Sequence, residues 1–143
     1  MSIGKICVRE VYLAEEEEST YVAAQRMREH SVGTLVILDK DKKPLGIITD
    51  RDLAMKVIAE GKDPAEVKVS QVMTINPRSL REDMPIEEGL RMMRGGQFRR
   101  LPVVDDKGAL QGLVSMDDIL ELLAEELSQI AKIIESQAKR RDI

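Results

Sequence analysis

One pattern occurs twice in this chain, and the repeat constrains the fold more than any other feature. The segment 46–52, Gly-Ile-Ile-Thr-Asp-Arg-Asp, returns at 112–118 as Gly-Leu-Val-Ser-Met-Asp-Asp. In both copies a glycine and two aliphatic residues lead to a hydroxyl residue, and an acidic residue follows three positions later. The repeat predicts two pseudo-symmetric halves, and symmetric halves favour paired sites at their junction.

The offset of 66 residues continues beyond the motif without a gap. Met27 falls on Met93, and the segment 35–39 falls on 101–105. Periods of about 20–50 residues indicate solenoids or propellers, whereas two copies of 66 residues indicate a duplicated small domain. A unit of about 60 residues buries too little surface to be very stable alone, so we expect the halves to pack on each other. We assign repeat one to residues 6–66, repeat two to 67–127 and a C-terminal helical extension to 128–143.

Composition excludes several classes of protein. The chain is 43% hydrophobic and 34% charged, as soluble globular proteins are. Its apolar runs are shorter than the roughly 18 residues that span a membrane, and its first residues lack a secretion signal. The single cysteine, Cys7, excludes an internal disulfide. We therefore expect a cytoplasmic protein without a membrane partner. The net charge of −4 and the 2% of aromatic residues argue against nucleic-acid binding.

Each half is predicted to contain helices and short strands, which gives an α/β (α+β) fold class. In repeat one a helix follows Ser19 or Thr20, residues 35–38 and 45–48 have the length of strands, and a second helix opens near Asp50. Repeat two has the same order. The connector keeps apolar residues and lacks a Gly/Ser-rich stretch, so we expect its tail, 72–74, to join the second sheet. Residues 6–8 hold the matching place in the first.

The last predicted helix continues past the point where its counterpart ends. Its apolar residues recur at three- and four-residue spacing: Ile119, Leu122, Leu123, Leu127, Ile130, Ile133 and Ile134. This stripe needs a partner, which is either its own domain or the same helix of another chain. We favour a homodimer, because symmetric dimers are the commonest oligomers.

The repeated motif has two interpretations. A hydroxyl residue followed three positions later by an acid is a common helix-capping signature. The same geometry also suits a nucleotide, since the free N–H groups at a helix N-terminus favour an anion. The acid of the motif could accept hydrogen bonds from both ribose hydroxyls. In this second interpretation Gly46 and Gly112 keep side-chain bulk away from the ligand, and Arg51 offsets phosphate charge.

Three segments carry a resemblance to a known family: Val-Met-Thr at 72–74, Arg-Leu-Pro-Val-Val-Asp at 100–105, and the motif at 46–53. Together they resemble a tandem pair of cystathionine-β-synthase (CBS) domains, a Bateman module, across roughly residues 6–127. The resemblance implies two three-stranded sheets, each with two helices, packed sheet to sheet in a free-standing module. It also implies that the two clefts between the halves bind adenosine-containing ligands, such as AMP, ADP, ATP, S-adenosylmethionine or NAD.

The family pattern assigns the nucleotide-binding residues by position. It gives the ribose contacts to Asp52 and Asp118 and the phosphate contacts to Thr49 and Ser115. Arg51 joins them as the cation that offsets phosphate charge. The family pattern gives the adenine contacts to the segments before the first strand of each half: Val32, Gly33, Thr34, Phe98, Arg99 and Arg100. Thr74 helps to close the pocket. Met116 stands where the first copy has Asp50, so we expect the Thr49–Asp52 site to be the stronger one.

These features support one main functional hypothesis and one alternative. The main hypothesis is a regulatory module that senses an adenine nucleotide or a related molecule, requires no cofactor and acts on an unidentified protein. The alternative is a scaffold that binds no ligand and dimerises through its C-terminal helix. An enzyme is the weakest interpretation, since the chain has no phosphate loop and no evident nucleophile–base pair. His30 is the only histidine and has no His/Cys cluster around it, so we predict no metal site.

Overall fold

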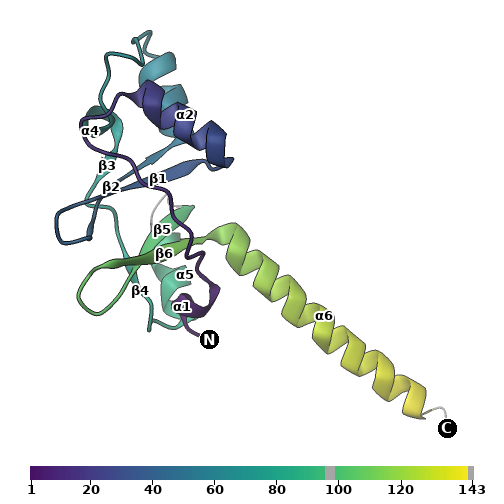
Figure 1. Ribbon diagram of the computed structural model, residues 1–143. Coiled ribbons are helices and arrows are strands. Elements are labelled where there is room, and N and C mark those ends of the chain that lie inside the picture. Colours follow the sequence, from purple (N-terminus) through teal and green to yellow (C-terminus); the bar gives the residue numbers. More distant parts are fainter. Residues whose placement is uncertain (96–98, 142–143) are drawn as a thin grey trace.

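The computed structural model describes residues 1–95 and 99–141 and has a mixed α/β architecture, as the sequence predicts (Figure 1). The first half contains α1 (Ile3–Ile6), α2 (Thr20–His30), β1 (Thr34–Leu38), β2 (Pro44–Thr49), α3 (Asp50–Leu53) and the π-helical segment η1 (Ala54–Ile58). The second half contains α4 (Val69–Val72), β3 (Thr74–Ile75), β4 (Leu80–Arg81), α5 (Ile86–Arg94), β5 (Arg100–Val104), β6 (Leu110–Ser115) and α6 (Met116–Arg141). The 66-residue offset relates α1 to α4, β1 to β5 and β2 to β6 without a shift.

Two three-stranded sheets form the centre of the molecule. The first has the order β1-β2-β3 and is antiparallel throughout. In the second, β4 runs parallel to β5, and β5 runs antiparallel to β6. Both central hairpins shift register at equivalent places, between Ile37 and Leu38 and between Val103 and Val104. The backbone thus preserves the symmetry that the low sequence identity obscures.

The halves exchange their leading segments, which corrects one prediction. Thr74 and Ile75 pair with β2 of the first sheet, and Val8 pairs with Leu113 of the second. We expected residues 72–74 in the second sheet and residues 6–8 in the first. The connector is short, so residues 72–75 reach the nearby edge of the first sheet before the chain crosses to the second half. Residues 6–8 make the reciprocal contact.

The motif glycines accommodate this exchange. A Cβ atom added to Gly46 would lie 2.5 Å from the Met73 sulfur, and one added to Gly112 would lie 2.6 Å from the Val8 carbonyl oxygen. Neither glycine lines the clefts described below. Their small size therefore serves strand packing, and not the ligand space that we inferred from the sequence.

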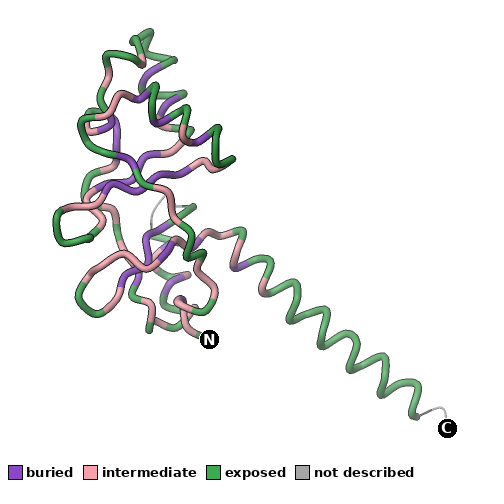
Figure 2. The backbone as a smooth tube through the Cα atoms, in the orientation of Figure 1, coloured by how far each residue is buried: buried purple, intermediate pink, exposed green. Residues whose placement is uncertain are grey.

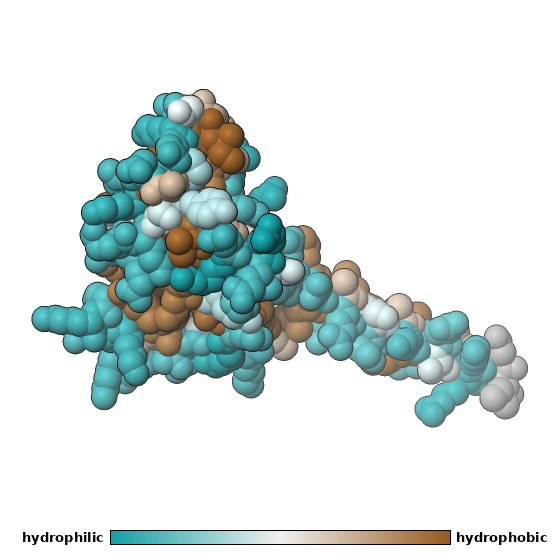
Figure 3. Space-filling model, turned by 45° about the horizontal axis from the view of Figure 1, so that its top comes forward, coloured by the Kyte–Doolittle hydropathy of each residue, from teal (hydrophilic) through white to brown (hydrophobic). Residues whose placement is uncertain are grey.

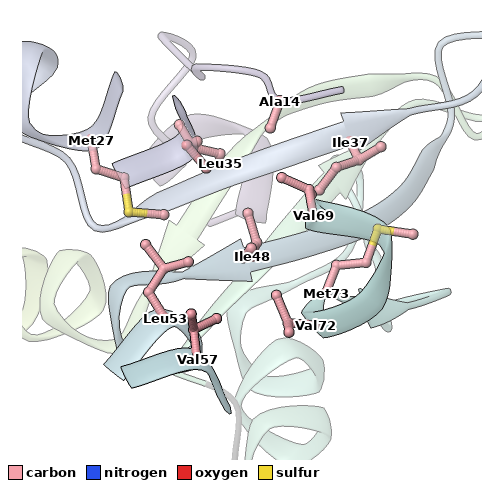
Figure 4. Packing of buried hydrophobic residues seen from close by; sticks show 11 residues of the cluster. Ala14, Met27, Leu35, Ile37, Ile48, Leu53, Val57, Val69, Val72 and Met73 are labelled. Atoms are coloured by element: carbon pink, nitrogen blue, oxygen red, sulfur yellow. The ribbon is translucent and has the colours of Figure 1, made fainter. Parts of the chain in front are cut away.

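The exchanged segments also complete the two hydrophobic cores. Val69, Val72 and Met73 belong to the first core, where Val69 points toward Ile37 and Val72 toward Ile48 (Figure 4). Ile3 of α1 is fully buried in the second core. The backbone fixes both segments, since Ile3 N–H donates to the Met84 carbonyl at 2.8 Å and Val69 N–H donates to the Glu18 carbonyl at 2.9 Å. Each half is therefore structurally incomplete without the other.

Strand β1 is buried on both faces. Leu35 and Ile37 belong to the helix-covered core. Val36 and Ile47 are also buried but lie outside that core. Successive side chains of a strand point to opposite faces, so Val36 and its partner Ile47 face the second sheet. Buried backbone accordingly runs through the middle of the molecule (Figure 2). This arrangement agrees with the sheet-to-sheet packing that the family resemblance implies.

A bidentate ion pair anchors α2 to the acidic segment before it. Arg26 donates to both carboxylate oxygens of Glu18, at 2.7 and 2.8 Å. The two side chains are 27% and 21% exposed, so solvent screens the pair only partly. The Arg26 hydrogen bonds hold the pKa of Glu18 below its ordinary value.

We predict that Glu18→Gln destabilises the protein more at neutral pH than in acid. A carboxyl whose pKa is lowered by folding adds stability above its unfolded pKa, and this stability is lost as the pH falls through the folded value. The difference in unfolding free energy between wild type and Glu18→Gln should therefore shrink from about pH 7 to about pH 3. Urea titrations at both pH values measure it, with the exposed Glu60→Gln as control. A difference that stays constant with pH would contradict the assignment.

Helix α6 leaves the body of the molecule and extends into solvent (Figure 1). The backbone is exposed along most of its length (Figure 2). Ile119, the first residue of the stripe, is buried in the second core. Leu127 is 67% exposed and Ile134 is 62% exposed, so the part of the stripe from Leu123 onward does not cover its own domain, one of the two possibilities left open by the sequence. Among the described residues, no helix is long and apolar enough to cross a membrane.

Candidate functional site: two clefts between the repeats

The first motif copy forms a complete helix cap where β2 meets α3. Thr49 Oγ1 accepts from Asp52 N–H at 3.1 Å, and Asp52 Oδ2 accepts from Thr49 N–H at 2.9 Å. The second copy repeats the geometry where β6 meets α6. There Ser115 Oγ accepts from Asp118 N–H at 3.1 Å, and Asp118 Oδ2 accepts from Ser115 N–H at 3.1 Å. The capping interpretation of the motif is thus confirmed for both copies.

Capping leaves the second carboxylate oxygen of each motif for other partners, and here the copies differ. Lys56 Nζ lies 3.1 Å from Asp52 Oδ1 and also donates to the Val72 carbonyl at 3.0 Å. The equivalent of Lys56 in repeat two is Leu122. Across residues 1–95 and 99–141, no ion pair involves Asp118. A ligand at Asp52 must therefore compete with an internal lysine, whereas Asp118 Oδ1 has no such competitor.

We predict that Ser115→Ala lowers the free energy of unfolding by about 1 kcal/mol. The substitution removes the acceptor of the Asp118 N–H bond and so uncaps α6. The exposed Ser136→Ala, farther along the same helix, is the matched control and should change stability by less than about 0.5 kcal/mol. Urea denaturation measures both variants. Equal effects would show that the cap contributes nothing.

One cavity between the repeats, cleft A, has a volume of about 300 Å³. Its floor carries the second motif, Ser115 and Asp118. Two segments of repeat one form the other walls: the turn between α2 and β1, and the exchanged N-terminal segment. The predicted residues among its lining are Val32, Gly33, Thr34, Arg100, Ser115 and Asp118.

A larger cavity, cleft B, has a volume of about 930 Å³. It contains the first motif and the beginning of β5. The predicted residues in its lining are Thr34, Thr49, Arg51, Asp52, Thr74, Arg99, Arg100 and Ser115. Its polar groups have both signs, because three acids join the three arginines: Asp50, Asp52 and Asp117. Clefts of about 300–1,000 Å³ are typical of small-molecule sites.

Both clefts are built from both repeats. The motif of one repeat lies opposite the segment that precedes the first strand of the other repeat. Every predicted site residue therefore lines at least one cleft, except Phe98, which lies outside the described residues. The sequence did not identify Glu10 and Tyr12, which line cleft A. Glu10 and Tyr12 come soon after residues 6–8 in the chain. Because Val8 pairs with the second sheet, the residues that follow it are brought to cleft A.

One residue pair lies between the clefts. Arg100 Nη1 donates to Thr34 Oγ1 at 3.1 Å, and both residues line both cavities. Their separation of 66 positions equals the repeat offset, so equivalent positions of the two repeats meet each other. Such contacts occur only at the pseudo-twofold axis. The axis therefore carries a guanidinium group that is close to both clefts.

The remaining candidate residues have structural roles. The His30 ring stacks on Tyr12, with ring centroids 4.0 Å apart. Burial raises the pKa of Cys7, which favours the protonated thiol, and Cys7 packs beside the second core. Within residues 1–95 and 99–141, no three His, Cys, Asp or Glu side chains gather in a way that could hold a metal ion.

The chain is similar to known proteins in its sequence. The family model described as "CBS domain" matches twice, at residues 3–59 and 69–125. An uncharacterised protein of Methanopyrus kandleri is 40% identical over 122 residues, which are 85% of this chain and 62% of that protein. The chain thus spans less than two thirds of that relative.

Two solved structures share the fold. A CBS domain pair in complex with 5′-methylthioadenosine and S-adenosyl-L-methionine has a TM-score of 0.78 and 28% identity, and the match covers 88% of this chain and 98% of that one. A hexameric CBS-CP12 protein from bloom-forming cyanobacteria has a TM-score of 0.77 and 26% identity, and the match covers 84% and 66% of the two chains.

Proposed function

Because the chain belongs to the CBS domain family and contains two copies of the domain, we propose that it is a regulatory module that binds an adenosine-containing ligand between its repeats. One observation carries this proposal. Each capping-box carboxylate lines a cleft whose opposite wall comes from the other repeat. A ligand held there touches both halves at once, so its binding free energy can alter their relative position.

The polar groups suit the parts of a nucleotide. An ionised carboxylate accepts hydrogen bonds only. Asp118 Oδ1 has no hydrogen-bond partner among the described residues, and it can accept from ribose hydroxyls. In cleft B, Arg51, Arg99 and Arg100 provide cations for phosphate groups. The related CBS pair that was solved with methylthioadenosine and S-adenosylmethionine supports this class of ligand. AMP, ADP, ATP and NAD remain candidates alongside these molecules.

Calorimetric titration tests the proposal. The probes are AMP, ADP, ATP, S-adenosylmethionine, methylthioadenosine and NAD, each added to the full chain. We expect heat and a raised melting temperature with at least one of them. No heat and no thermal shift with any probe would refute the proposal. Mass spectrometry of small molecules retained by gently purified protein tests independently whether the chain carries such a ligand. Because we propose binding without turnover, an added nucleotide should remain intact.

A second function, assembly, is favoured by the exposed stripe on α6. We propose that the chain is a homodimer in the cytoplasm and regulates an unidentified protein, without nucleic-acid or membrane partners. Water-exposed apolar side chains recur along the helix (Figure 3), and burying them against a second copy stabilises the pair. Deleting residues 128–143 should convert the dimer to a monomer in sedimentation experiments. A truncated chain that remains dimeric would show that the interface lies elsewhere.

A further inference from the structure

A seam of five exposed apolar residues on α6, which shares four members with the stripe and adds Leu120, has the spacing of a two-helix coiled coil. Its side chains alternate three and four positions apart, as at the a and d positions of a coiled coil: Leu120, Leu123, Leu127, Ile130 and Ile134. All five are between 47% and 67% exposed. Leu120 lines cleft B of its own chain, whereas the residues after it lie on the part of α6 that extends into solvent (Figure 1). The seam therefore requires a second helix.

The charges of α6 are divided between its two ends. Acidic side chains dominate the N-terminal half: Asp117, Asp118, Glu121, Glu125 and Glu126. Basic side chains dominate the C-terminal half, with Glu135 as the exception: Lys132, Lys139 and Arg140. Packed helices lie about 8–10 Å apart, which is within the range of electrostatic interaction at physiological salt. A parallel pair would place acid beside acid and base beside base.

Small residues flank the seam on one side. Ala124, Ala131 and Ala138 are seven positions apart, follow the stripe and are exposed. In an antiparallel pair, Ala124 of one copy lies opposite Ala131 of the other. Side chains this small allow two helices to approach closely along that edge. The seam then consists of layers such as Leu127 of one copy against Ile130 of the other.

We propose that α6 of one chain packs antiparallel against α6 of a second copy, with the acidic half of each helix beside the basic half of the other. This inference rests on the proposed homodimer and adds its orientation. The two ligand-binding bodies then lie at opposite ends of a helical pair. The helix spans about 39 Å at 1.5 Å per residue, so the two bodies are held apart.

Spin-label distances distinguish the orientations. Single cysteines at Ser128→Cys and Lys139→Cys, in a Cys7→Ala background that still dimerises, report the middle and the end of α6. In the antiparallel pair, labels at position 128 lie close together, while labels at 139 are separated by about 30 Å along the axis, from the rise of 1.5 Å per residue. Labels within about 20 Å of each other at position 139, given the 8–10 Å interaxial distance, would establish a parallel pair and overturn the orientation. A chain that is monomeric by sedimentation would overturn the dimer as well.

Charge reversal provides an independent test. The double variant Lys132→Glu/Lys139→Glu makes both halves of α6 acidic, so an antiparallel dimer should weaken about tenfold or more. In a parallel dimer like charges already lie side by side, so its dissociation constant would not change. The control variant Lys62→Glu/Lys107→Glu alters the net charge equally at exposed positions outside α6. Equal weakening in both variants would overturn the proposal, because it would reflect net charge alone. Circular dichroism checks that α6 remains helical.

Discussion

Replacing Ile3 with alanine should lower the free energy of unfolding by about 2–5 kcal/mol. So large an effect is unusual for the third residue of a chain, since terminal residues are commonly frayed. Ile3 is fully buried, and its side chain packs against the second core beside Leu80 and Leu101. Truncating Ile3 leaves a cavity in the second half of the molecule, although Ile3 precedes the first half in the chain.

The reciprocal position provides a second measurement. Val69 lies 66 residues after Ile3 and is fully buried in the first core, so Val69→Ala should also destabilise the chain. Ile58→Ala is the control, because Ile58 is 71% exposed and surface changes stay within about 0.5 kcal/mol. Urea denaturation at a fixed protein concentration measures all three variants, and hydrogen exchange should be accelerated in β5 and β6 for Ile3→Ala. If Ile3→Ala and Ile58→Ala have equal effects, the segment exchange is wrong.

The second large effect is expected at Asp118. Asp118→Asn should weaken the binding of an adenosine ligand in cleft A by about ten- to a hundredfold, because a hydrogen bond to a charged group contributes about 1.5–3 kcal/mol. The asparagine oxygen can still accept from Ser115 N–H, so the cap is retained. The change replaces the carboxylate oxygen that takes no part in the cap. Calorimetry measures the affinity, and urea denaturation verifies that stability is kept.

Two matched variants sharpen this test. Asp52→Asn should have a smaller effect on ribose binding, because Lys56 already holds Asp52 Oδ1. Asp41→Asn, at an exposed hairpin position, should leave the affinity unchanged. Equal losses in Asp118→Asn and Asp41→Asn would exclude a direct ribose contact at Asp118.

The duplication made much of the fold predictable from sequence. Aligning the two copies gave the strands, the helix starts and the connector, because apolar and turn positions repeat at a fixed offset. It could not give the partner of each edge strand. Residues 6–8 and 72–74 have equivalent sequences in equivalent places, so their apolar patterns fit either sheet equally well. In the structure Gly46 leaves room for Met73 and Gly112 leaves room for Val8, which fits each segment to the sheet of the other half. A sequence pattern does not show these contacts, because the residues are far apart in the chain.

The sequence predicted a set of ligand-binding residues and two unequal sites, and both remain predictions. The motif and the family pattern identified residues that line the clefts, because a chain turn at the end of a strand places them there. The sequence favoured the Thr49–Asp52 site, and that ranking remains a prediction. Lys56 acts against this ranking, since helical spacing places its amine on Asp52. Leu122 holds the equivalent position in repeat two, and among the described residues no lysine or arginine pairs with Asp118. Glu10 and Tyr12 were not predicted, because their place in cleft A depends on the segment exchange.

The central claim is that a ligand binds between the repeats and contacts both. An NMR titration of the isotopically labelled chain tests it most directly, using the adenosine ligand that gives the strongest calorimetric signal. For a ligand in cleft A, the amide resonances of Gly33 and Asp118 should shift along the same saturation curve, although these residues belong to different repeats. Resonance shifts confined to one repeat, or no shifts at saturating ligand, would contradict the account.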